Sequence, residues 1–375
     1  MEIKNLEKVA KIIKKAINNE ERIIIYGDSD LDGVASVIIL KESIEGLGGK
    51  VDQIYFPDRE KEGYGLNLKA LNVLKPKAPA LLILMDCGIS NFQQIELAQK
   101  IGFEIIVVDH HEILDKLPKA KIVVNPKQPK DKYPFKQLAT AGIALKLSFS
   151  LLGEKSLHIL NNNFREIAAL ATIADMMPQI QDNKVIIDEG LADLKQVTRP
   201  GLKIFFKIEK GLRFLSAREV AQKIISVLNA GETKKHLNVA YSLLISEDKR
   251  MVTALARELI KKRNQNQMMI NKITEEVDKS VLIKPEELIV FEGERPWRHS
   301  LLGAVASRIC NKLQKPVFLF RRKEKFSIGA VRTPHGIDGV KAMKSCEKLL
   351  KGFGGHPAAA GFTIENKNLE KFREC

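Results

Sequence analysis

One short stretch near the amino terminus most constrains how this chain can fold. An apolar, β-branched run at residues 23–26 leads into three alternating aspartates, Asp28, Asp30 and Asp32, and an apolar helix pattern follows over residues 34–40. If the run is a buried strand of a parallel sheet, the aspartates lie at the edge where open α/β sheets bind ligands. Carboxylates about 4 Å apart repel each other by roughly 4 kcal/mol per pair at an effective dielectric of about 20. The stretch therefore predicts a site for a hard multivalent cation.

Two other interpretations of these aspartates stay open. The pattern Asp-x-Asp-x-Asp-Gly also begins a calcium-binding EF-hand loop, but the twelfth position of that loop requires a bidentate glutamate and is Ile39 in this chain. A strand pattern also precedes the motif, where an EF-hand would have a helix. A solvated turn is the second alternative, and the rest of the chain argues against it.

Two further strand patterns end in residues of the same kind. An apolar run at 80–85 precedes Asp86, and another at 104–108 precedes the sequence Asp-His-His at 109–111. Apolar runs that alternate with helix patterns predict a doubly wound parallel sheet of the α/β class. One such residue after a strand would be unremarkable, but three strand ends that deliver carboxylate or imidazole to one edge favour a shared site.

A further carboxylate, Asp175, lies in the nearly all-apolar segment 166–178. A buried carboxylate without a partner is costly, so Asp175 must be paired or must bind a metal ion. We favour the metal ion, with a hydrogen bond to a helix terminus as the alternative.

The charge of the chain favours a polyanionic partner. The 375 residues include 61 Lys and Arg against 46 Asp and Glu, a net charge of +15, although lysines spread along the whole chain also suit general solubility. The length is enough for two domains. Because no run of 18 apolar residues is present, we expect no membrane partner and a soluble, cytoplasmic protein. Four cysteines show no metal-type spacing, and we expect no disulfide framework in so large a chain.

The second half of the chain predicts a helical segment followed by another domain. Residues 184–277 are helical in pattern, and the run 247–279 predicts a long helix between domains. Short strands and turns follow, so we expect a smaller α/β domain, with the active site in a cleft between it and the first domain. The expected division into catalytic domain, helical connector and substrate-binding domain is 1–195, 196–280 and 281–375.

Two glycine-containing segments are candidates for contacting a ligand. Glycine pairs within 352–361 allow a backbone to approach a ligand closely, and His356 beside them would then touch a phosphate. The loop 57–66 has two glycines around Tyr64 and suits a tight surface turn. A packed glycine-rich turn and a plain connector are the respective structural alternatives.

Together these motifs resemble the DHH phosphoesterase superfamily. The motifs that carry the resemblance are Asp28-Ser-Asp30-Leu-Asp32-Gly33, Asp86, Asp109-His110-His111 and Asp175. Three further segments are similar to the RecJ-type single-strand exonucleases, whose second domain is the DHHA1 module: Pro57-x-Arg59-x-x-Glu62-Gly63-Tyr64-Gly65-Leu66, 297–308 and Gly354-Gly355-His356-x-Ala-Ala-Ala-Gly361. The resemblance covers nearly the whole chain.

The resemblance implies a set of site residues. Two divalent cations, Mn²⁺ or Mg²⁺, would be bound with Asp86 between them, and the implied ligands are Asp28, Asp30, Asp32, Asp86, His110 and Asp175. His111 would contact the scissile phosphate and help with proton transfer, with Asp109 and Asp86 as the other catalytic residues. The implied substrate-binding residues are Arg59, Tyr64, Arg332, Gly354, Gly355 and His356. Many members have histidine where this chain has Tyr26, so the first metal site leans on Asp28.

The resemblance also implies the reaction. We expect a metal-dependent exonuclease that removes nucleotides from the end of single-stranded DNA, in the 5′ to 3′ direction by family habit, with RNA as the alternative strand. We further expect a monomer with replication or repair proteins as candidate partners. Bacterial relatives commonly continue into an OB-fold, so we expect the end at Cys375 to be that of a fragment.

Two other functions stay open. A small-substrate DHH phosphoesterase would act on oligoribonucleotides, nucleoside bisphosphates or cyclic dinucleotides, but such substrates do not need the 62–65 loop or the long basic connector. An inactive scaffold of a replication complex is the other alternative. Such proteins usually lose motif carboxylates, whereas this chain keeps all of them.

Overall fold

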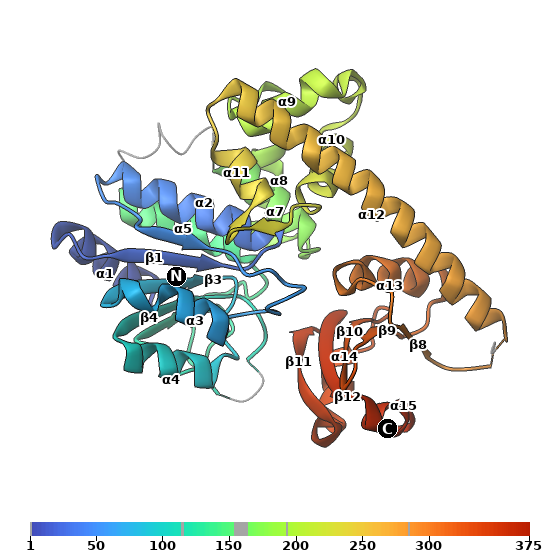
Figure 1. The fold of residues 1–375 in the computed structure, drawn as a ribbon. Helices are drawn as coiled ribbons and strands as arrows, with labels where there is room; N and C mark the ends of the chain where they lie inside the picture. Colours follow the sequence, from blue (N-terminus) through green and yellow to red (C-terminus); the bar gives the residue numbers. More distant parts are fainter. Residues whose placement is uncertain (1, 114–115, 154–163, 193, 284–285) are drawn as a thin grey trace. The chain divides into compact units, whose positions relative to one another are not determined.

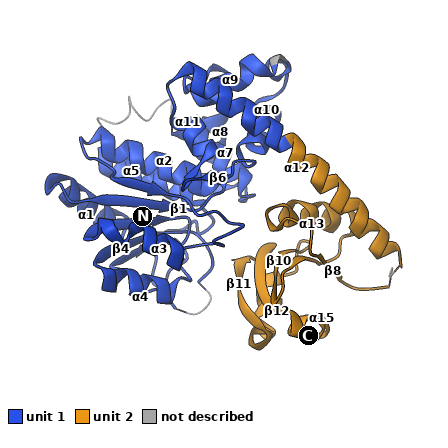
Figure 2. Cartoon of the chain, in the orientation of Figure 1, with its two compact units in different colours: residues 1–263 blue, residues 264–375 orange. Residues whose placement is uncertain are grey.

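The computed structural model describes residues 2–113, 116–153, 164–192, 194–283 and 286–375. Contacts divide the chain into two compact units, residues 1–263 and 264–375 (Figure 2). The boundary falls inside one long helix, and most of the expected helical connector belongs to the first unit. The three-part division expected from the sequence stays a prediction.

The first unit is built on a five-stranded parallel sheet in the order β2-β1-β3-β4-β5 (Figure 1). Its strands are β1 (Ile23–Gly27), β2 (Gln53–Tyr55), β3 (Ala80–Met85), β4 (Phe103–Val108) and β5 (Ile122–Val124). The chain leaves β1 to one side for β2 and then crosses to the other side for β3. Doubly wound sheets bind ligands at such a switch point, outside the carboxyl ends of the strands. The doubly wound sheet expected from the sequence is thereby confirmed.

Each face of this sheet has its own apolar core. Ile23 and Ile25 of β1 belong to one core, and Ile24 and Tyr26 belong to the other, because successive side chains of a strand point to opposite faces. The helices on the first face are α1 (Leu6–Asn18), α2 (Leu31–Gly46), α5 (Thr140–Leu152) and α7 (Arg165–Ala174), and those on the second face are α3 (Leu68–Leu74) and α4 (Phe92–Ile101). Burial on both faces explains why the strands are continuous apolar runs.

The rest of the first unit is mainly helical, as expected for residues 184–277. Its helices are α8 (Gln181–Ala192), the 3₁₀ turn η3 (Leu194–Gln196), α9 (Pro200–Ile208), the 3₁₀ turn η4 (Lys210–Phe214), α10 (Ala217–Leu228) and α11 (Val239–Ile245). The long helix expected over 247–279 is α12 (Lys249–Ile283), which contains the unit boundary. Two strands of two residues each, β6 (Thr233–Lys234) and β7 (Leu237–Asn238), pair as a hairpin. This hairpin was not predicted from the sequence because strands so short show no periodicity. Although α12 has 35 residues, no helix among the described residues is apolar enough to cross a membrane.

The second unit is a mixed five-stranded sheet in the order β11-β12-β10-β9-β8. Its elements are β8 (Val290–Glu294), α13 (His299–Leu313), β9 (Val317–Arg322), β10 (Phe326–Arg332), α14 (Gly339–Ser345), β11 (Leu350–His356), β12 (Ala359–Glu365) and α15 (Leu369–Glu374). Only the pair β8–β9 is parallel. Helix α13 packs on β9 and β10. This is the smaller α/β domain that the sequence predicts.

The structure does not support the structural alternative given for residues 352–361, a packed glycine-rich turn. The glycine-rich segment 352–361 forms strands of the hairpin β11–β12, and only Pro357 and Ala358 lie between the strands. Glycine is depleted in strands, so the pattern gave no strand signal.

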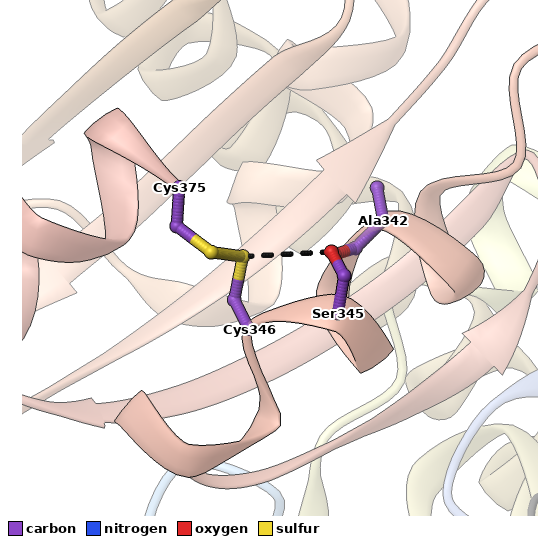
Figure 3. The surroundings of a disulfide bond; sticks show 4 residues. All are labelled: Ala342, Ser345, Cys346 and Cys375. Atoms are coloured by element: carbon purple, nitrogen blue, oxygen red, sulfur yellow. Dashed lines mark hydrogen bonds between the residues drawn. A yellow bond between two sulfur atoms is a disulfide. The ribbon is translucent and has the colours of Figure 1, made fainter.

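A disulfide bond joins Cys346 to Cys375, which corrects the expectation that the cysteines are unpaired (Figure 3). Cys346 follows α14 and Cys375 follows α15, and their Cα atoms are 6.2 Å apart. The Ser345 hydroxyl lies 3.7 Å from the Cys346 sulfur. The expectation was based on chain length, whereas pairing depends on the approach of two Cα atoms that sequence spacing does not reveal. Cys87 and Cys310 are free and buried.

Candidate metal centre

The first acidic motif occupies the short connection between β1 and α2. Asp30 is the N-cap of α2, and its Oδ1 accepts a hydrogen bond from the Gly33 N–H (3.1 Å). Asp28 and Asp32 on either side are both buried. Gly33 is required by a close backbone approach, because a Cβ at this position would lie 2.2 Å from the carbonyl oxygen of Asp28. The motif is therefore a tight turn that holds three carboxylates after one strand.

The first turn of α5 orients two of the acids. The backbone N–H groups of Thr140 and Ala141 each donate to one oxygen of Asp32 at 2.8 Å. The Thr140 hydroxyl donates to Oδ1 of Asp86, also at 2.8 Å. A helix amino terminus stabilises a carboxylate. Sequence reasoning missed Thr140, and its only signal was a hydroxyl residue at the start of an apolar helix pattern.

Asp86 follows β3 in an unusual backbone conformation. Its φ is +62°, in the left-handed region that non-glycine residues rarely adopt, and its side chain is buried. Such conformations typically cost roughly 1–3 kcal/mol and cluster at functional sites. The conformation agrees with the functional role predicted for Asp86, which stays a prediction.

His110 follows β4 and presents one nitrogen to the acids. Its Nδ1 lies 2.9 Å from the carbonyl oxygen of Leu138, and because a carbonyl can only accept, Nδ1 carries the hydrogen. Nε2 then has a lone pair that faces carboxylate oxygens of Asp175 (3.3 Å), Asp86 (3.5 Å) and Asp32 (3.8 Å). A lone pair surrounded by carboxylates is stable only with a proton or a cation among them. This is the arrangement of a metal-ligating histidine.

Asp109 holds His111, and these two residues form a further group with Asp86 in which the ligand atoms lie within 4.8 Å of one another. The Asp109 carboxylate accepts hydrogen bonds from the N–H groups of Ile89 (3.0 Å), His110 (2.8 Å) and His111 (3.1 Å). It also contacts Nδ1 of His111 at 2.8 Å. Burial by itself would raise the pKa of Asp109. The neighbouring His111 and these hydrogen bonds have the larger combined effect, so the pKa of Asp109 lies below its ordinary value. Asp109 is therefore a positioning residue for a charged His111.

The six predicted ligands lie in two groups whose ligand atoms are within 4.8 Å of one another. One group is Asp32, His110 and Asp175, and the other is Asp28, Asp30 and Asp86. Asp86 belongs to the second group but lies 3.5 Å from Nε2 of His110 in the first. The structure thus brings all six residues to the carboxyl edge of the sheet, with Asp86 between the groups. Their assignment as ligands stays a prediction.

The acids of this site are short of positive charge. Burial, reinforced by neighbouring aspartates, raises the pKa of Asp32 to about 7 and the pKa values of Asp86 and Asp175 well above the ordinary range. Oδ2 of Asp175 is buried and has no hydrogen-bond partner among the described residues. Asp175 lies at the carboxyl end of α7, where the helix dipole disfavours a carboxylate, so the helix-terminus alternative gains no support. These features fit a bound cation.

The loop 57–66 reaches into the site, which excludes its interpretation as a plain connector. Arg59 pairs with Asp28 through Nε (2.8 Å) and Nη2, and Nη2 also lies 2.9 Å from Asp30. Arg59 thus neutralises two predicted ligands. The Tyr64 hydroxyl donates to the carbonyl oxygen of Asp86 (3.0 Å), and its ring packs edge-on against His111.

The hairpin β6–β7 supports the same loops from behind. Asn238 donates from Nδ2 to the carbonyl oxygen of Ser29 (2.8 Å), and the Thr233 hydroxyl donates to the carbonyl oxygen of Pro57 (3.1 Å). Sequence reasoning missed both residues, since polar side chains in a short hairpin carry no signal of this role. A site on loops that are held by such hydrogen bonds keeps its geometry better than a site on unsupported loops.

The predicted substrate-binding residues of the second unit lie near one end of the strands β10 and β11, with β12 between them. Arg332 on β10 and His356 on β11 both pair with Ala359 of β12, so their side chains share one face. Nε of Arg332 donates to the Ser307 hydroxyl (3.0 Å). Gly355 has φ +133°, and a Cβ there would lie 2.5 Å from the Ala359 carbonyl oxygen. The expected cleft between domains stays a prediction.

Comparison with protein families assigns both parts of the chain. The DHH family, N-terminal domain, matches residues 22–174, and the DHHA1 domain matches residues 286–375. The chain therefore contains a DHH-family N-terminal domain at residues 22–174 and a DHHA1 domain at residues 286–375.

Individual relatives are similar to this chain over nearly its whole length. The chain is similar to the single-stranded-DNA-specific exonuclease RecJ of Bacillus subtilis (34% identity over 99% of this chain) and to that of Thermus thermophilus (30% over 99%). A solved structure of exonuclease RecJ bound to manganese is similar with a TM-score of 0.79 at 29% identity, and the match covers 100% of this chain and 94% of that one. This chain spans about half the length of the curated relatives, 47% of the Bacillus and 54% of the Thermus protein.

Proposed function

We propose that this protein is a metal-dependent exonuclease that hydrolyses phosphodiester bonds at the end of single-stranded DNA. The observation that carries the proposal is the pair of ligand groups that meet at Asp86, at the switch point of a doubly wound sheet. The relatives named as exonuclease RecJ support this activity. By the same likeness we propose the 5′ to 3′ direction and a monomer that acts in the cytoplasm with repair or replication proteins.

The residues present fit two divalent cations, for which we propose Mn²⁺ or Mg²⁺. One group offers Asp32, His110 and Asp175, and the other is Asp28, Asp30 and Asp86. Carboxylate oxygens and imidazole nitrogen are donors that Mn²⁺ accepts, and the RecJ structure bound to manganese supports this choice. Such a pair of ions activates a water nucleophile and stabilises the attacking and leaving oxygens of an in-line displacement.

His111 is the group that we assign to the scissile phosphate. Burial alone lowers its pKa, but the Asp109 carboxylate and the more distant Asp175 raise it to about 9. In the metal-free protein His111 is therefore charged at neutral pH, and a charged His111 can donate a strong hydrogen bond to a phosphate oxygen or a proton to the leaving oxygen. The hydroxyl of Tyr64, 3.2 Å from Nδ1, restricts the rotation of the ring.

The second unit supplies residues for holding the strand. Arg332 and His356 share one face of the sheet, and we assign them to backbone or terminal phosphates. Gly354 and Gly355 beside them let the β11 backbone approach the same phosphates.

The test is digestion of end-labelled single-stranded DNA with Mn²⁺, compared with duplex DNA, single-stranded RNA and a dinucleotide. We expect mononucleotide release from single-stranded DNA, and Asp86→Asn should abolish it. Asp188→Asn, on the exposed side of α8, is the matched control and should retain full activity. Undiminished release by Asp86→Asn would refute the two-metal assignment, and cleavage of the dinucleotide alone would favour the small-substrate phosphoesterase.

A further inference from the structure

A basic hollow on the helical part of the first unit has no role in the site described above. It has a volume of about 380 Å³ and is formed by η3, α9 and η4. Its lining residues are Lys195, Gln196, Val197, Lys203, Phe206, Lys207 and Arg213. Helix α9 lies at the top of the first unit in Figure 1 and packs on α11. We call this hollow the α9 pocket.

The rim of the α9 pocket carries uncompensated positive charge. Its cations are Lys195, Lys203, Lys207 and Arg213, its lining includes no acid, and none of the four forms an ion pair within the described parts of the chain. Lys203 and Lys207 are one helical turn apart on α9 and share a side of the helix. Nζ of Lys195 donates to the carbonyl oxygen of Arg213 (3.4 Å), which links η3 to η4.

Two acids close in sequence to the lining residues are engaged elsewhere. Glu209, at the end of α9, pairs with Arg263 on α12 at 3.3 Å. Glu219 accepts the backbone and hydroxyl hydrogen bonds of Ser216 in the capping box of α10, and Lys195 acts on it only at longer range. Four cations around one hollow therefore attract an anion from solution.

Two buried apolar side chains line the pocket, and an exposed aromatic residue, Phe214, follows the lining residue Arg213 in the sequence without lining the pocket itself. The two lining side chains, Val197 and Phe206, are 3% and 6% exposed. Phe214 is 90% exposed. Inorganic phosphate needs only the cations, whereas a nucleotide strand also offers bases that stack on an exposed aromatic ring. Cations beside an exposed aromatic are the combination that binds single-stranded nucleic acids without sequence preference.

We propose that the α9 pocket is an accessory binding site for single-stranded DNA. Lys203, Lys207 and Arg213 neutralise backbone phosphates, and Phe214 stacks on a base. The choice of DNA strand rests on the proposed function, but the site shares no residue with the metal centre. Its role is to retain a long strand, so it does not contribute to cleavage of the shortest substrates.

The test compares two charge-matched triple variants. Lys203→Gln/Lys207→Gln/Arg213→Gln removes the pocket cations, and Lys8→Gln/Lys11→Gln/Lys15→Gln removes the same charge from exposed positions of α1. Both are combined with Asp86→Asn, so that the strand stays intact while fluorescence anisotropy measures its affinity across salt concentrations. We expect the pocket variant to lower the slope of log affinity against log salt by about 2, because each lost phosphate contact to a single strand contributes roughly 0.7. The α1 variant should change neither slope nor affinity.

Two further measurements separate a strand site from a phosphate site. Phe214→Ala should weaken binding of a long strand roughly tenfold and leave the salt slope unchanged, because it removes stacking and no charge. In the nuclease-competent protein, the pocket triple variant should cleave a dinucleotide at the wild-type rate. Equal slopes for the two triple variants, or equal loss of affinity for inorganic phosphate and for the strand, would overturn the proposal. If Asp86→Asn abolishes cleavage but the pocket and α1 triple variants have equal salt slopes, only the pocket proposal is refuted. If Asp86→Asn retains cleavage but the salt slopes of the two triple variants differ, only the nuclease mechanism is refuted.

Discussion

Replacing Asp109 with asparagine tests how the site keeps His111 charged. Burial alone lowers the pKa of His111, and the Asp109 carboxylate, 2.8 Å from Nδ1, is the main group that raises it from 6.5 to about 9. This difference corresponds to roughly 3 kcal/mol of preference for the charged imidazole. Because the folded-state pKa lies above the ordinary value, the contribution to stability is fully present below pH 6.5 and is lost as the pH rises through 9.

Asparagine has nearly the same size but no charge, so burial should dominate in the variant. We expect an NMR titration of the chelator-treated protein to show the pKa of His111 near or below 6.5 in Asp109→Asn. The difference in unfolding free energy between wild type and variant should be largest below pH 6.5 and shrink above pH 9, as measured by chemical denaturation. Asp131→Asn is the matched control, since Asp131 is buried and pairs with Lys136 away from the site. A His111 titration that is the same in Asp109→Asn and wild type would refute the reasoning.

Three further predictions concern the metal centre. Gly33→Ala should destabilise the protein by about 1–3 kcal/mol and remove nuclease activity, because the new Cβ would lie 2.2 Å from a backbone oxygen. In the control Gly352→Ala the new Cβ meets nothing within 4 Å, so this variant should behave like the wild type in thermal melts and digestion assays. Thr140→Val removes a hydrogen bond to Asp86 and should weaken Mn²⁺ binding roughly tenfold to a hundredfold in calorimetry, with rescue by Thr140→Ser; unchanged affinity would contradict its orienting role. The pKa of Asp32 is raised to about 7, so the metal-free protein should lose stability as the pH rises through 7. Mn²⁺ should therefore raise the melting temperature more at pH 8 than at pH 6. An equal or smaller rise at pH 8 would contradict the charge argument.

The sequence predicts those parts of the fold that repeat a strong pattern. The run 80–85 has the bounds of β3, and the acids after β1, β3 and β4 meet at one edge because parallel strands share a direction. The pattern missed β5, which has three residues, and the glycine-rich hairpin β11–β12. Both are held by pairing with neighbouring strands, which a single sequence does not report.

For the site, residue identity indicated which acids and histidines gather at the edge of the sheet, but not their partners. Arg59 was expected to bind phosphate and pairs with Asp28 and Asp30. Asp109 was grouped with the catalytic residues, which stays a prediction, and nothing in the sequence indicated its hydrogen bonds to His111 and to the N–H groups of Ile89 and His110. These roles depend on which side chains face each other across loops, and periodicity and spacing do not encode that.

Because the strands of the first sheet share one direction, its loops fall into two groups that should differ in how well they tolerate insertions. Connections at the amino ends of the strands, such as the one through Gly48 between α2 and β2, lie at the edge opposite the acids. Gly48 and Gly63 have similar backbone angles, φ +80° and +82°, and neither has an atom within 4 Å of its absent side chain. A peptide inserted at Gly48 should be tolerated, whereas the same insertion at Gly63 would pull Tyr64 away from Asp86. Loops at the amino ends of the strands should thus tolerate inserted peptides and fused domains, whereas the loops at the carboxyl ends should not.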